Sequence, residues 1–216
     1  MNICTHPLLD PALLETTWPT PLAQVAGLAD LVERLDRAPG GSVQRCEQTQ
    51  VVVRDLLRVG GFKPSGRSKP ASEYLIKAHA GGFIGPINPA VDACNIASLH
   101  SGLPISVVDL DRTDGPLSLA IVEPGVRYVF NASGQEIDVG GLICLHDGLG
   151  PCGGPVKDSE RTKTHDGTTR TLSIVWGTTQ LPGRTEATAR WYGALLEGLG
   201  AQVQISLPAV PRDPLG

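Results

Sequence analysis

Long hydrophobic runs are missing from this chain of 216 residues. None approaches the roughly 20 apolar residues that a helix needs to cross a bilayer. The first residues, MNICTHPLLDPALLETTWP, carry acids and prolines and no basic cluster, unlike a secretory signal peptide. The five cysteines are scattered without a CxxC spacing, which is typical of reduced thiols and not of a disulfide framework or zinc site. We therefore expect a cytoplasmic protein that does not contact a membrane.

The sequence also lacks an excess of positive charge, since its formal net charge is −4. A chain of this charge has no overall attraction for nucleic acid, although a local basic loop can still contact RNA. We expect no binding to DNA. A G-x-S-x-G nucleophile motif, an H-E-x-x-H metal motif and a P-loop are all missing. We therefore expect neither a metal nor another cofactor.

The hydrophobic content of 41% is enough for one sizeable core. Apolar spacing predicts helices over residues 22–35, 43–59, 72–79 and 184–199, and one that begins near Asn88. Short runs rich in Val, Ile and Leu predict strands in ISVVDLD, PLSLAIV, RYVF, LICLHD, TLSIVWGTT and AQVQISLPAV. The fold class is thus a mixed α and β (α+β) layered domain. We expect residues 1–42 to be an extension that contains one helix, and residues 1–20 of this extension to wrap the surface. Residues 43–210 should form the domain, and residues 211–216 a tail.

The segment INPAVDACNIASLHSGLPISVVDLD, residues 87–111, raises the main functional question. On a helix that starts near Asn88, the side chains of Asn88, Asp92 and Asn95 share one face. Asn88 and Asp92 can be explained as a helix cap and an acceptor for nearby backbone donors, with Pro89 tolerated in the first turn. Asn95 lies within the helix, where asparagine has no propensity advantage. It therefore either faces water or binds a ligand.

The most charged stretch is GGPVKDSERTKTHDGTTR, residues 153–170. Gly153 and Gly154 would let a ligand approach the backbone closely, and Lys157 and Arg161 could contact phosphate. A solvated loop is the alternative. His146 and Asp147 end a predicted strand, where neighbours face opposite sides, so a turn is favoured over a catalytic pair.

Taken together, INPAVDACN…GLPISVVD resembles the N-x-x-V-D-x-x-N…G-x-P-x-x-x-x-D signature of the editing domain in the phenylalanyl-tRNA synthetase beta chain. The resemblance continues in order through LSLAIV, LICLHD, the paired glycines and the Thr-rich turn HDGTT, over about residues 51–182. It implies a β-sandwich-like core with flanking helices. It also implies a freestanding relative of the editing domain that hydrolyses a misacylated tRNA.

The resemblance places the family's pocket residues on particular positions of this chain. It implies catalytic roles for Asn95 and Ser106, which would position the aminoacyl end or a water. It implies a substrate-binding set of Asn88, Asp92, Cys94, Gly153, Gly154, Val175 and Trp176, while Lys157 and Arg161 would contact phosphate. Cys94 stands where the family has threonine, Ser106 where it has histidine, and Val175, next to Trp176, where a glutamate reads the tyrosine hydroxyl. A pocket without those polar groups should not favour tyrosine.

Two functional interpretations follow from these residues. The first is a deacylase that cleaves the ester of a misacylated tRNA in trans, with neither a metal nor a covalent nucleophile. The alternative is a non-catalytic module that binds a tRNA end, a nucleotide or a free amino acid. The sequence does not identify the amino acid, the tRNA or the oligomeric state.

Overall fold

The computed structural model describes residues 1–28, 30–37, 40 and 43–212. The described residues contain two four-stranded sheets and a hairpin. In the large sheet the strand order is β10 (Gln202–Ser206), β2 (Leu9–Thr17), β9 (Arg170–Thr178) and β3 (Ile105–Asp109), and neighbours are antiparallel. In the small sheet the order is β1 (Asn2–Ile3), β4 (Ser118–Ile121), β7 (Ile143–Asp147) and β8 (Gly150–Gly153). Strands β5 (Arg127–Val129) and β6 (Glu136–Asp138) form the hairpin.

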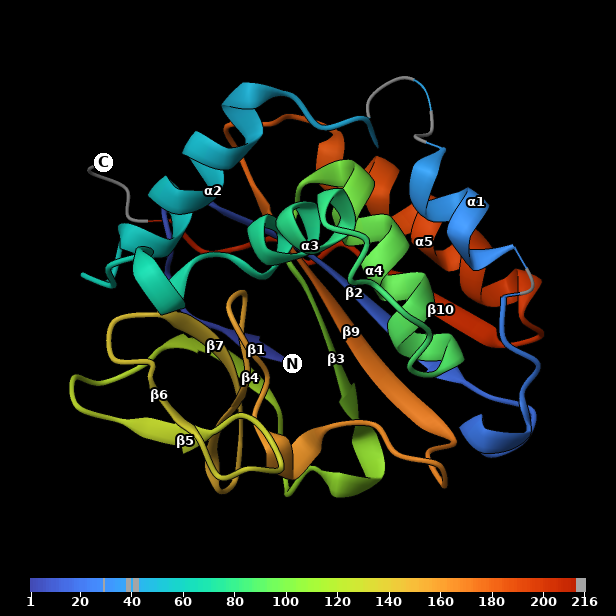
Figure 1. The fold of residues 1–216 in the computed structure, drawn as a ribbon. Helices are drawn as coiled ribbons and strands as arrows, with labels where there is room; N and C mark the ends of the chain where they lie inside the picture. Colours follow the sequence, from blue (N-terminus) through green and yellow to red (C-terminus); the bar gives the residue numbers. More distant parts are fainter. Residues whose placement is uncertain (29, 38–39, 41–42, 213–216) are drawn as a thin grey trace.

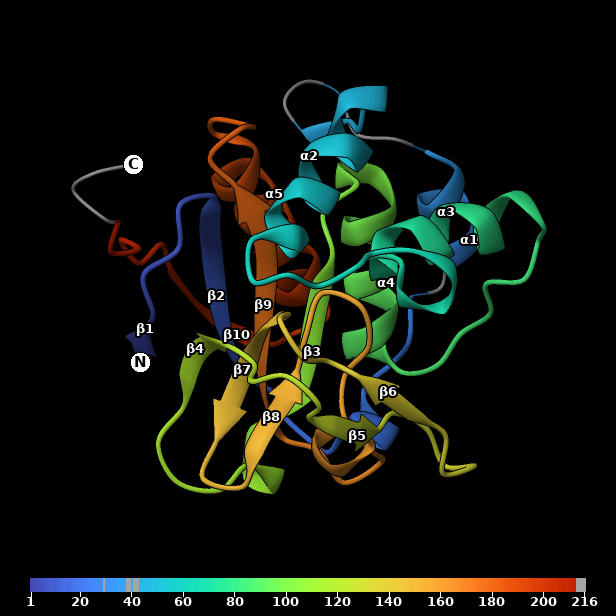
Figure 2. The same ribbon diagram turned by 90° about the vertical axis from the view of Figure 1, so that its left-hand side faces the viewer.

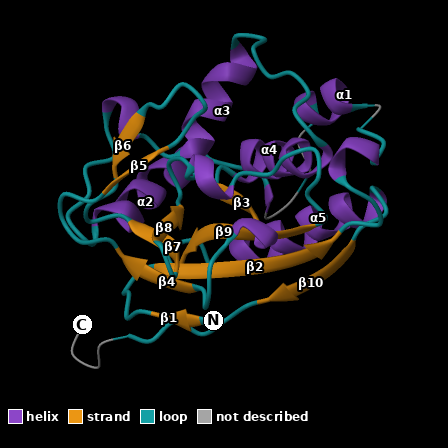
Figure 3. Ribbon diagram, turned by 90° about the horizontal axis from the view of Figure 1, so that it is seen from below, coloured by secondary structure: helices purple, strands orange, loops and turns teal. Residues whose placement is uncertain are grey.

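Helices cover one face of the large sheet (Figures 1 and 3). The helices are α1 (Leu31–Asp36), α2 (Glu47–Arg58), α3 (Ala71–Ala80), α4 (Pro89–Ser101) and α5 (Arg184–Gly198). Helix α5 contacts β2, β9 and β10, and α4 contacts both β3 and α5. This arrangement confirms the predicted mixed α+β class with layers.

The core lies between these layers and continues between the two sheets. Strand β9 is buried along almost its whole length, because helices pack on one face and the small sheet lies near the other (Figure 2). Its side chains include the fully buried Val175 and Trp176. Both faces of this strand are buried for that reason, and its buried polar side chains Thr171 and Ser173 form hydrogen bonds with Trp18 and Tyr192.

The prediction that residues 1–20 wrap the surface is wrong. Strand β2 lies between β10 and β9 and pairs with β9 over nine residues. Pro11 is tolerated because β10 begins to pair with β2 only at Leu13, so the strand has a free edge at the proline. The large sheet thus includes residues that we had assigned to an extension outside the domain.

The predicted helix over residues 22–35 is also too long. A 3₁₀ turn covers Leu22–Gln24, and the α-helical part is confined to Leu31–Asp36. Residue 29 lies outside the described residues. Gly27 lies between the two short segments, and glycine is among the weakest helix formers.

Helix α4 begins and ends as its sequence predicts. The side chain of Asn88 accepts a hydrogen bond from the N–H of Val91 at 3.0 Å, and Pro89 is the first helical residue. The helix ends at Gly102, whose φ of 73° is left-handed and suits glycine. Strand β3 starts three residues later, so the chain folds back and places the strand beside the helix.

Candidate functional site

A cavity of about 290 Å³ lies where the first turns of α4 meet β3. Its volume is at the small end of ligand pockets, which span roughly 300–1,000 Å³. The chain segment after β8 closes its third side. The lining consists of Ile87, Asn88, Val91, Cys94, Asn95, Ile105, Val107, Asp158, Lys163 and Thr164.

The cavity forms at an open edge of the large sheet, because β3 is its terminal strand. The N–H of Val107 donates to Asp158 Oδ2 at 3.3 Å. On the same strand, the carbonyl oxygen of Ile105 accepts from the thiol of Cys94 at 3.6 Å. Side chains of helix α4 and of the 158–164 segment thus satisfy backbone groups that an edge strand otherwise leaves unpaired.

Asp158 contributes a carboxylate to the cavity wall. Its Oδ1 accepts the N–H of Gly154 at 3.0 Å, and its Oδ2 accepts that of Val107. Burial raises the pKa of this carboxyl to about 6, although the nearby Ser106 hydroxyl, the two N–H groups and Lys163 favour the charged form. A carboxyl group with this pKa is largely ionised at neutral pH and can still take up a proton. Such groups are frequent at catalytic sites.

Asn95 lines the same cavity and is half-buried. No hydrogen bond joins its side chain to any other group in the described part of the chain, so its amide is available to a ligand. Asn88 and Asp92 are occupied instead. Asn88 caps α4 and donates to Thr164 Oγ1 at 3.1 Å, while Asp92 accepts the N–H of Ile87 at 2.9 Å. The backbone roles that the sequence suggested for these two residues are thus confirmed.

Cys94 forms part of the cavity wall from helix α4. Its thiol is buried, and burial together with the charge of Asp158 raises its pKa far above the ordinary value. A thiol in this environment stays protonated and is a poor nucleophile. The predicted role of Cys94 as a wall of the pocket therefore agrees with its surroundings.

Ser106 lies on the other face of β3 from Ile105 and Val107, because side chains alternate along a strand. Its hydroxyl is fully buried, accepts from Trp176 Nε1 at 2.9 Å and donates to the carbonyl of Gly154 at 3.1 Å. The cavity lining therefore does not include Ser106, in contrast to the prediction that Ser106 positions the reacting atoms. Its hydroxyl instead joins β3 and β9 to the segment after β8.

The cavity lining also lacks five residues of the predicted substrate-binding set, which are Asp92, Gly153, Gly154, Val175 and Trp176, and both predicted phosphate contacts, Lys157 and Arg161. Val175 is fully buried between Ile105 and Ala12, its partners on the neighbouring strands. Trp176 is fully buried as well. A Cβ on Gly153 would stand 3.2 Å from Val108 Cγ1, and one on Gly154 would stand 3.0 Å from Cys144 Sγ. The paired glycines therefore let β8 and its following residues pack closely, and the N–H of Gly154 is already bonded to Asp158.

The two cations that were predicted to contact phosphate differ in their surroundings. Arg161 forms a bidentate ion pair with Asp147, at 2.7 and 2.9 Å. Lys157 has its ammonium 3.6 Å from the centre of the Phe130 ring. Arg161 is therefore occupied, and Lys157 is available. Asp147 also accepts the N–H groups of Asp114 and Leu149, so it forms the turn predicted at the end of its strand.

We expect Arg161→Ala to lower the free energy of unfolding by about 2–4 kcal/mol, because the buried Asp147 carboxylate would lose its partner. Burial raises the pKa of the Asp147 carboxyl, but the ion pair with Arg161 and the N–H groups that Asp147 accepts outweigh burial and lower this pKa. In the wild type the stabilisation by the ionised pair is therefore present above the unfolded-state pKa and is lost as the pH falls through the lower folded-state pKa. Urea unfolding of both proteins at pH 7 and at pH 3 measures this stabilisation. A loss for Arg161→Ala that is equally large at both values would contradict the assignment.

Sequence reasoning missed Asp158, Lys163 and Thr164 as cavity residues. All three lie in the charged stretch 153–170, which was recognised as a possible contact with a ligand. Nothing in the spacing of that loop shows which of its charged residues turns inward. The hydrogen bonds of Asp158 to Gly154 and Val107 decide this, and they form only when β8 and β3 are brought together.

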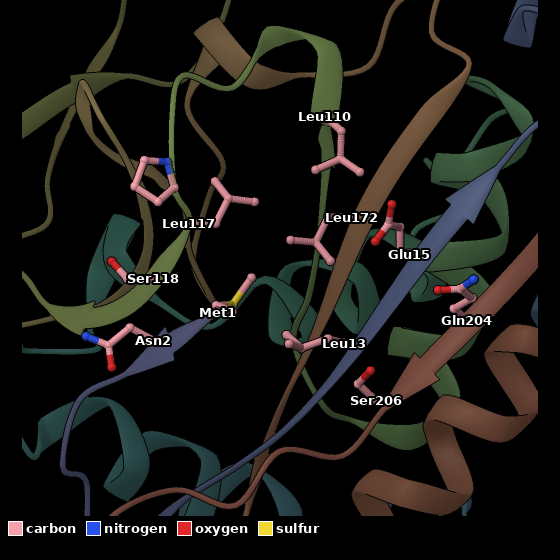
Figure 4. Close-up of a pocket in the computed structure, with 11 residues that line it drawn as sticks. Met1, Asn2, Leu13, Glu15, Leu110, Leu117, Ser118, Leu172, Gln204 and Ser206 are labelled. Atoms are coloured by element: carbon pink, nitrogen blue, oxygen red, sulfur yellow. The ribbon is translucent and has the colours of Figure 1, made fainter.

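A larger cavity, of about 770 Å³, lies between the large sheet and the small sheet (Figure 4). It is lined by Met1, Asn2, Leu13, Glu15, Leu110, Pro116, Leu117, Ser118, Leu172, Gln204 and Ser206. Its single carboxylate, Glu15, pairs with Arg170 at 3.0 Å, and no histidine, cysteine, lysine or arginine side chain is among these lining residues. The smaller cavity holds the groups suited to chemistry, and we take it as the candidate site.

Within the described ranges, no group of three or more His, Cys, Asp or Glu side chains is arranged to hold a metal ion. None of the helices in those ranges combines the length and hydrophobicity needed to cross a membrane.

No family model matches the chain. A search of curated proteins finds no significant match. Among solved structures, the chain is similar to an N-terminal fragment of the phenylalanyl-tRNA synthetase beta-subunit from Pyrococcus horikoshii, with a TM-score of 0.45 and 14% sequence identity. The similarity covers 53% of this chain and 41% of that chain. The chain thus spans less than half the length of the fragment.

Proposed function

We propose that the protein hydrolyses the ester of a misacylated tRNA in trans and that the cavity between α4 and β3 holds the aminoacyl group. The observation that carries the proposal is the pairing of two unlike groups in one small cavity. Asn95 offers an amide that has no hydrogen-bond partner among the described residues, and Asp158 offers a carboxyl of pKa about 6. The segment whose sequence resembles the editing-domain signature supplies two of the cavity walls, α4 and β3.

The proposed reaction needs a base and a donor for the developing negative charge. The carboxylate of Asp158 accepts a proton from a water molecule, whose oxygen attacks the ester carbonyl carbon. The amide of Asn95 donates to the carbonyl oxygen as it becomes negative. The bond to the ribose oxygen then breaks, and that oxygen takes up the proton from Asp158, which returns to its carboxylate form. The products are the free amino acid and the uncharged tRNA.

The lining also bears on the choice of amino acid. Ile87, Val91, Ile105 and Val107 give the cavity an apolar wall. An unpaired tyrosine hydroxyl against such a wall loses roughly 1–3 kcal/mol. We therefore expect side chains that are apolar and smaller than tyrosine to be preferred.

The test is a panel of aminoacyl-tRNAs in which release of the amino acid is followed over time. We expect release from at least one of them, no preference for tyrosine, and no effect of a metal chelator. Asn95→Ala should slow the release about 100-fold, in the range found when one oxyanion donor is removed. Gln202→Ala is the matched control, because this amide lies exposed on β10, far from the cavity lining. Selective hydrolysis of tyrosyl-tRNA would contradict the proposed specificity, and no release from any member would contradict the activity.

A second candidate function is binding of a free amino acid, and Lys163 favours it. This cation, which also pairs with Glu160 at 3.1 Å, lines the cavity together with Asp158, so both charges of a free amino acid would meet an opposite charge. An aminoacyl ester has no carboxylate for Lys163 to bind. Calorimetric titration with free amino acids distinguishes the two functions, since this candidate predicts tight binding that is lost in Lys163→Met.

A further inference from the structure

A second groove, of about 580 Å³, lies beside the candidate site. It runs between the start of α3 with the preceding 3₁₀ turn (Gly66–Ser68) and the β5–β6 hairpin. Its lining comprises Arg67, Ser68, Tyr74, Phe130, Gln135, Glu136, Ile137, Asp138 and Lys157. The groove thus combines two aromatic rings with charges of both signs.

Its two cations have no acidic partner among the described residues. Arg67 is exposed, and neither Arg67 nor Lys157 forms an ion pair or a side-chain hydrogen bond with a described residue. The pKa of Lys157 is lowered by burial and by the positive charges of Arg67 and Lys163. Lys163 pairs with Glu160 at 3.1 Å, whereas Arg67 and Lys157 form no ion pair in the described part of the chain. Two neighbouring cations without such a partner make a favourable place for an anion. Glu136 and Asp138 are occupied, by Arg127 and by the N–H of Gly140.

The aromatic rings of the groove are held in fixed positions. The Tyr74 hydroxyl donates to the carbonyl of Gly66 at 3.1 Å, and 37% of the residue is exposed. The ammonium of Lys157 lies 3.6 Å from the Phe130 ring centre and 5.9 Å from that of Tyr74. The Phe130 ring therefore orients a cation, and Tyr74 is the exposed aromatic residue of the groove. Cations next to an exposed aromatic face are the pattern that binds single-stranded nucleic acid.

One short chain segment separates this groove from the candidate site. Lys157 lines the groove, and the next residue, Asp158, lines the cavity. Lys163 of the cavity donates through its Nζ to the carbonyl of Phe130 at 2.5 Å, and Phe130 lines the groove. The Tyr128 hydroxyl fixes the same segment by donating to the carbonyl of Lys157. A ligand that fills the cavity and continues outward can therefore reach the groove.

We propose that this groove binds the single-stranded nucleotides that precede the aminoacylated 3′ residue. This inference rests on the proposed function. A base stacks on Tyr74, and phosphates pair with Arg67 and Lys157. The acids Glu136 and Asp138 repel phosphate from the far end of the groove, which fixes the course of the strand. The groove would thus provide a local RNA-binding site on a protein whose net charge is negative.

The test is binding of a fluorescent four-nucleotide RNA that matches the 3′ end of tRNA and carries no amino acid, measured by anisotropy. We expect Tyr74→Ala to weaken binding roughly tenfold, whereas Tyr74→Phe should keep most of the affinity because it keeps the ring. Arg67→Ala and Lys157→Met should each weaken binding and lower the salt dependence by about one phosphate contact. Lys63→Ala is the control, since this exposed lysine precedes the 3₁₀ turn and does not line the groove.

The outcomes separate this inference from the proposed function. RNA binding that depends on Tyr74, Arg67 and Lys157, without any deacylation, would support the groove as an RNA-binding site and overturn the proposed catalysis. Deacylation that needs Asn95 but whose KM is unchanged in Tyr74→Ala and Arg67→Ala would overturn the groove alone. No binding of the RNA, or equal loss in Lys63→Ala and Arg67→Ala, would also overturn it. Equal affinity for inorganic phosphate and the RNA would reduce the groove to an anion site.

Discussion

Asp158→Asn should lower the rate of aminoacyl-tRNA hydrolysis by about 100- to 1,000-fold, because asparagine cannot accept the proton of the attacking water. The hydrogen bonds from Gly154 and Val107 hold the carboxylate in place at the cavity wall. With a pKa of about 6, the wild-type rate should rise with pH through that value and level off above pH 7. Single-turnover assays between pH 5 and pH 8 measure both effects. A variant that retains the wild-type rate and pH profile would exclude Asp158 as the base.

The Asp158 carboxyl also affects the pH dependence of stability, and this dependence serves as an internal control for Asp158→Asn. Its folded-state pKa of about 6 exceeds the ordinary value of 3.8, so the folded state binds more protons between these two values. The free energy of unfolding should therefore fall as the pH rises from about 4 to 6, by at most about 3 kcal/mol. Asp158→Asn should remove this dependence. A loss of activity without this change in pH dependence would point to an indirect effect of the substitution.

Trp176→Ala should lower the free energy of unfolding by about 3–5 kcal/mol, the range for deletion of a large aromatic side chain from a core. Trp176 has no exposed surface, and its Nε1 donates to the hydroxyl of Ser106. Trp176→Phe keeps most of the packing and loses only this hydrogen bond, so we expect a loss of about 1–2 kcal/mol. Equilibrium unfolding in urea measures both variants.

The comparison of these two variants also tests how Trp176 acts in the site. If it supports the cavity from within the core, Trp176→Phe should leave the preference among aminoacyl-tRNAs unchanged. A stable Trp176→Ala protein with an altered preference would show instead that the indole contacts the ligand. That result would restore the role implied by the resemblance to the editing domain.

Local sequence was sufficient for the elements whose interactions are local. Asn88, Pro89 and Gly102 mark the ends of α4, because a cap, a first-turn proline and a left-handed glycine act within a few residues of the chain. The hydrophobic runs of β3, β7 and β9 likewise identified these strands. Strand β2 was missed, since three prolines and two acids in residues 1–20 suggest a surface segment. Its partners lie more than 150 residues away in the sequence.

The composition of the candidate site depended on contacts that sequence spacing does not contain. Asn95 was predicted because its place on one face of the helix follows from the 3.6-residue period, whereas Cys94 was assigned only through the resemblance to the editing domain. Ser106 was assigned to the cavity, yet the alternation along β3 directs it toward Trp176 and Gly154. Arg161 is bound by Asp147, and Asp158 faces the cavity because β8 and β3 supply its two N–H donors. Local patterns thus determined which segments contribute to the site, and the packing of the two sheets decided which side chains line it.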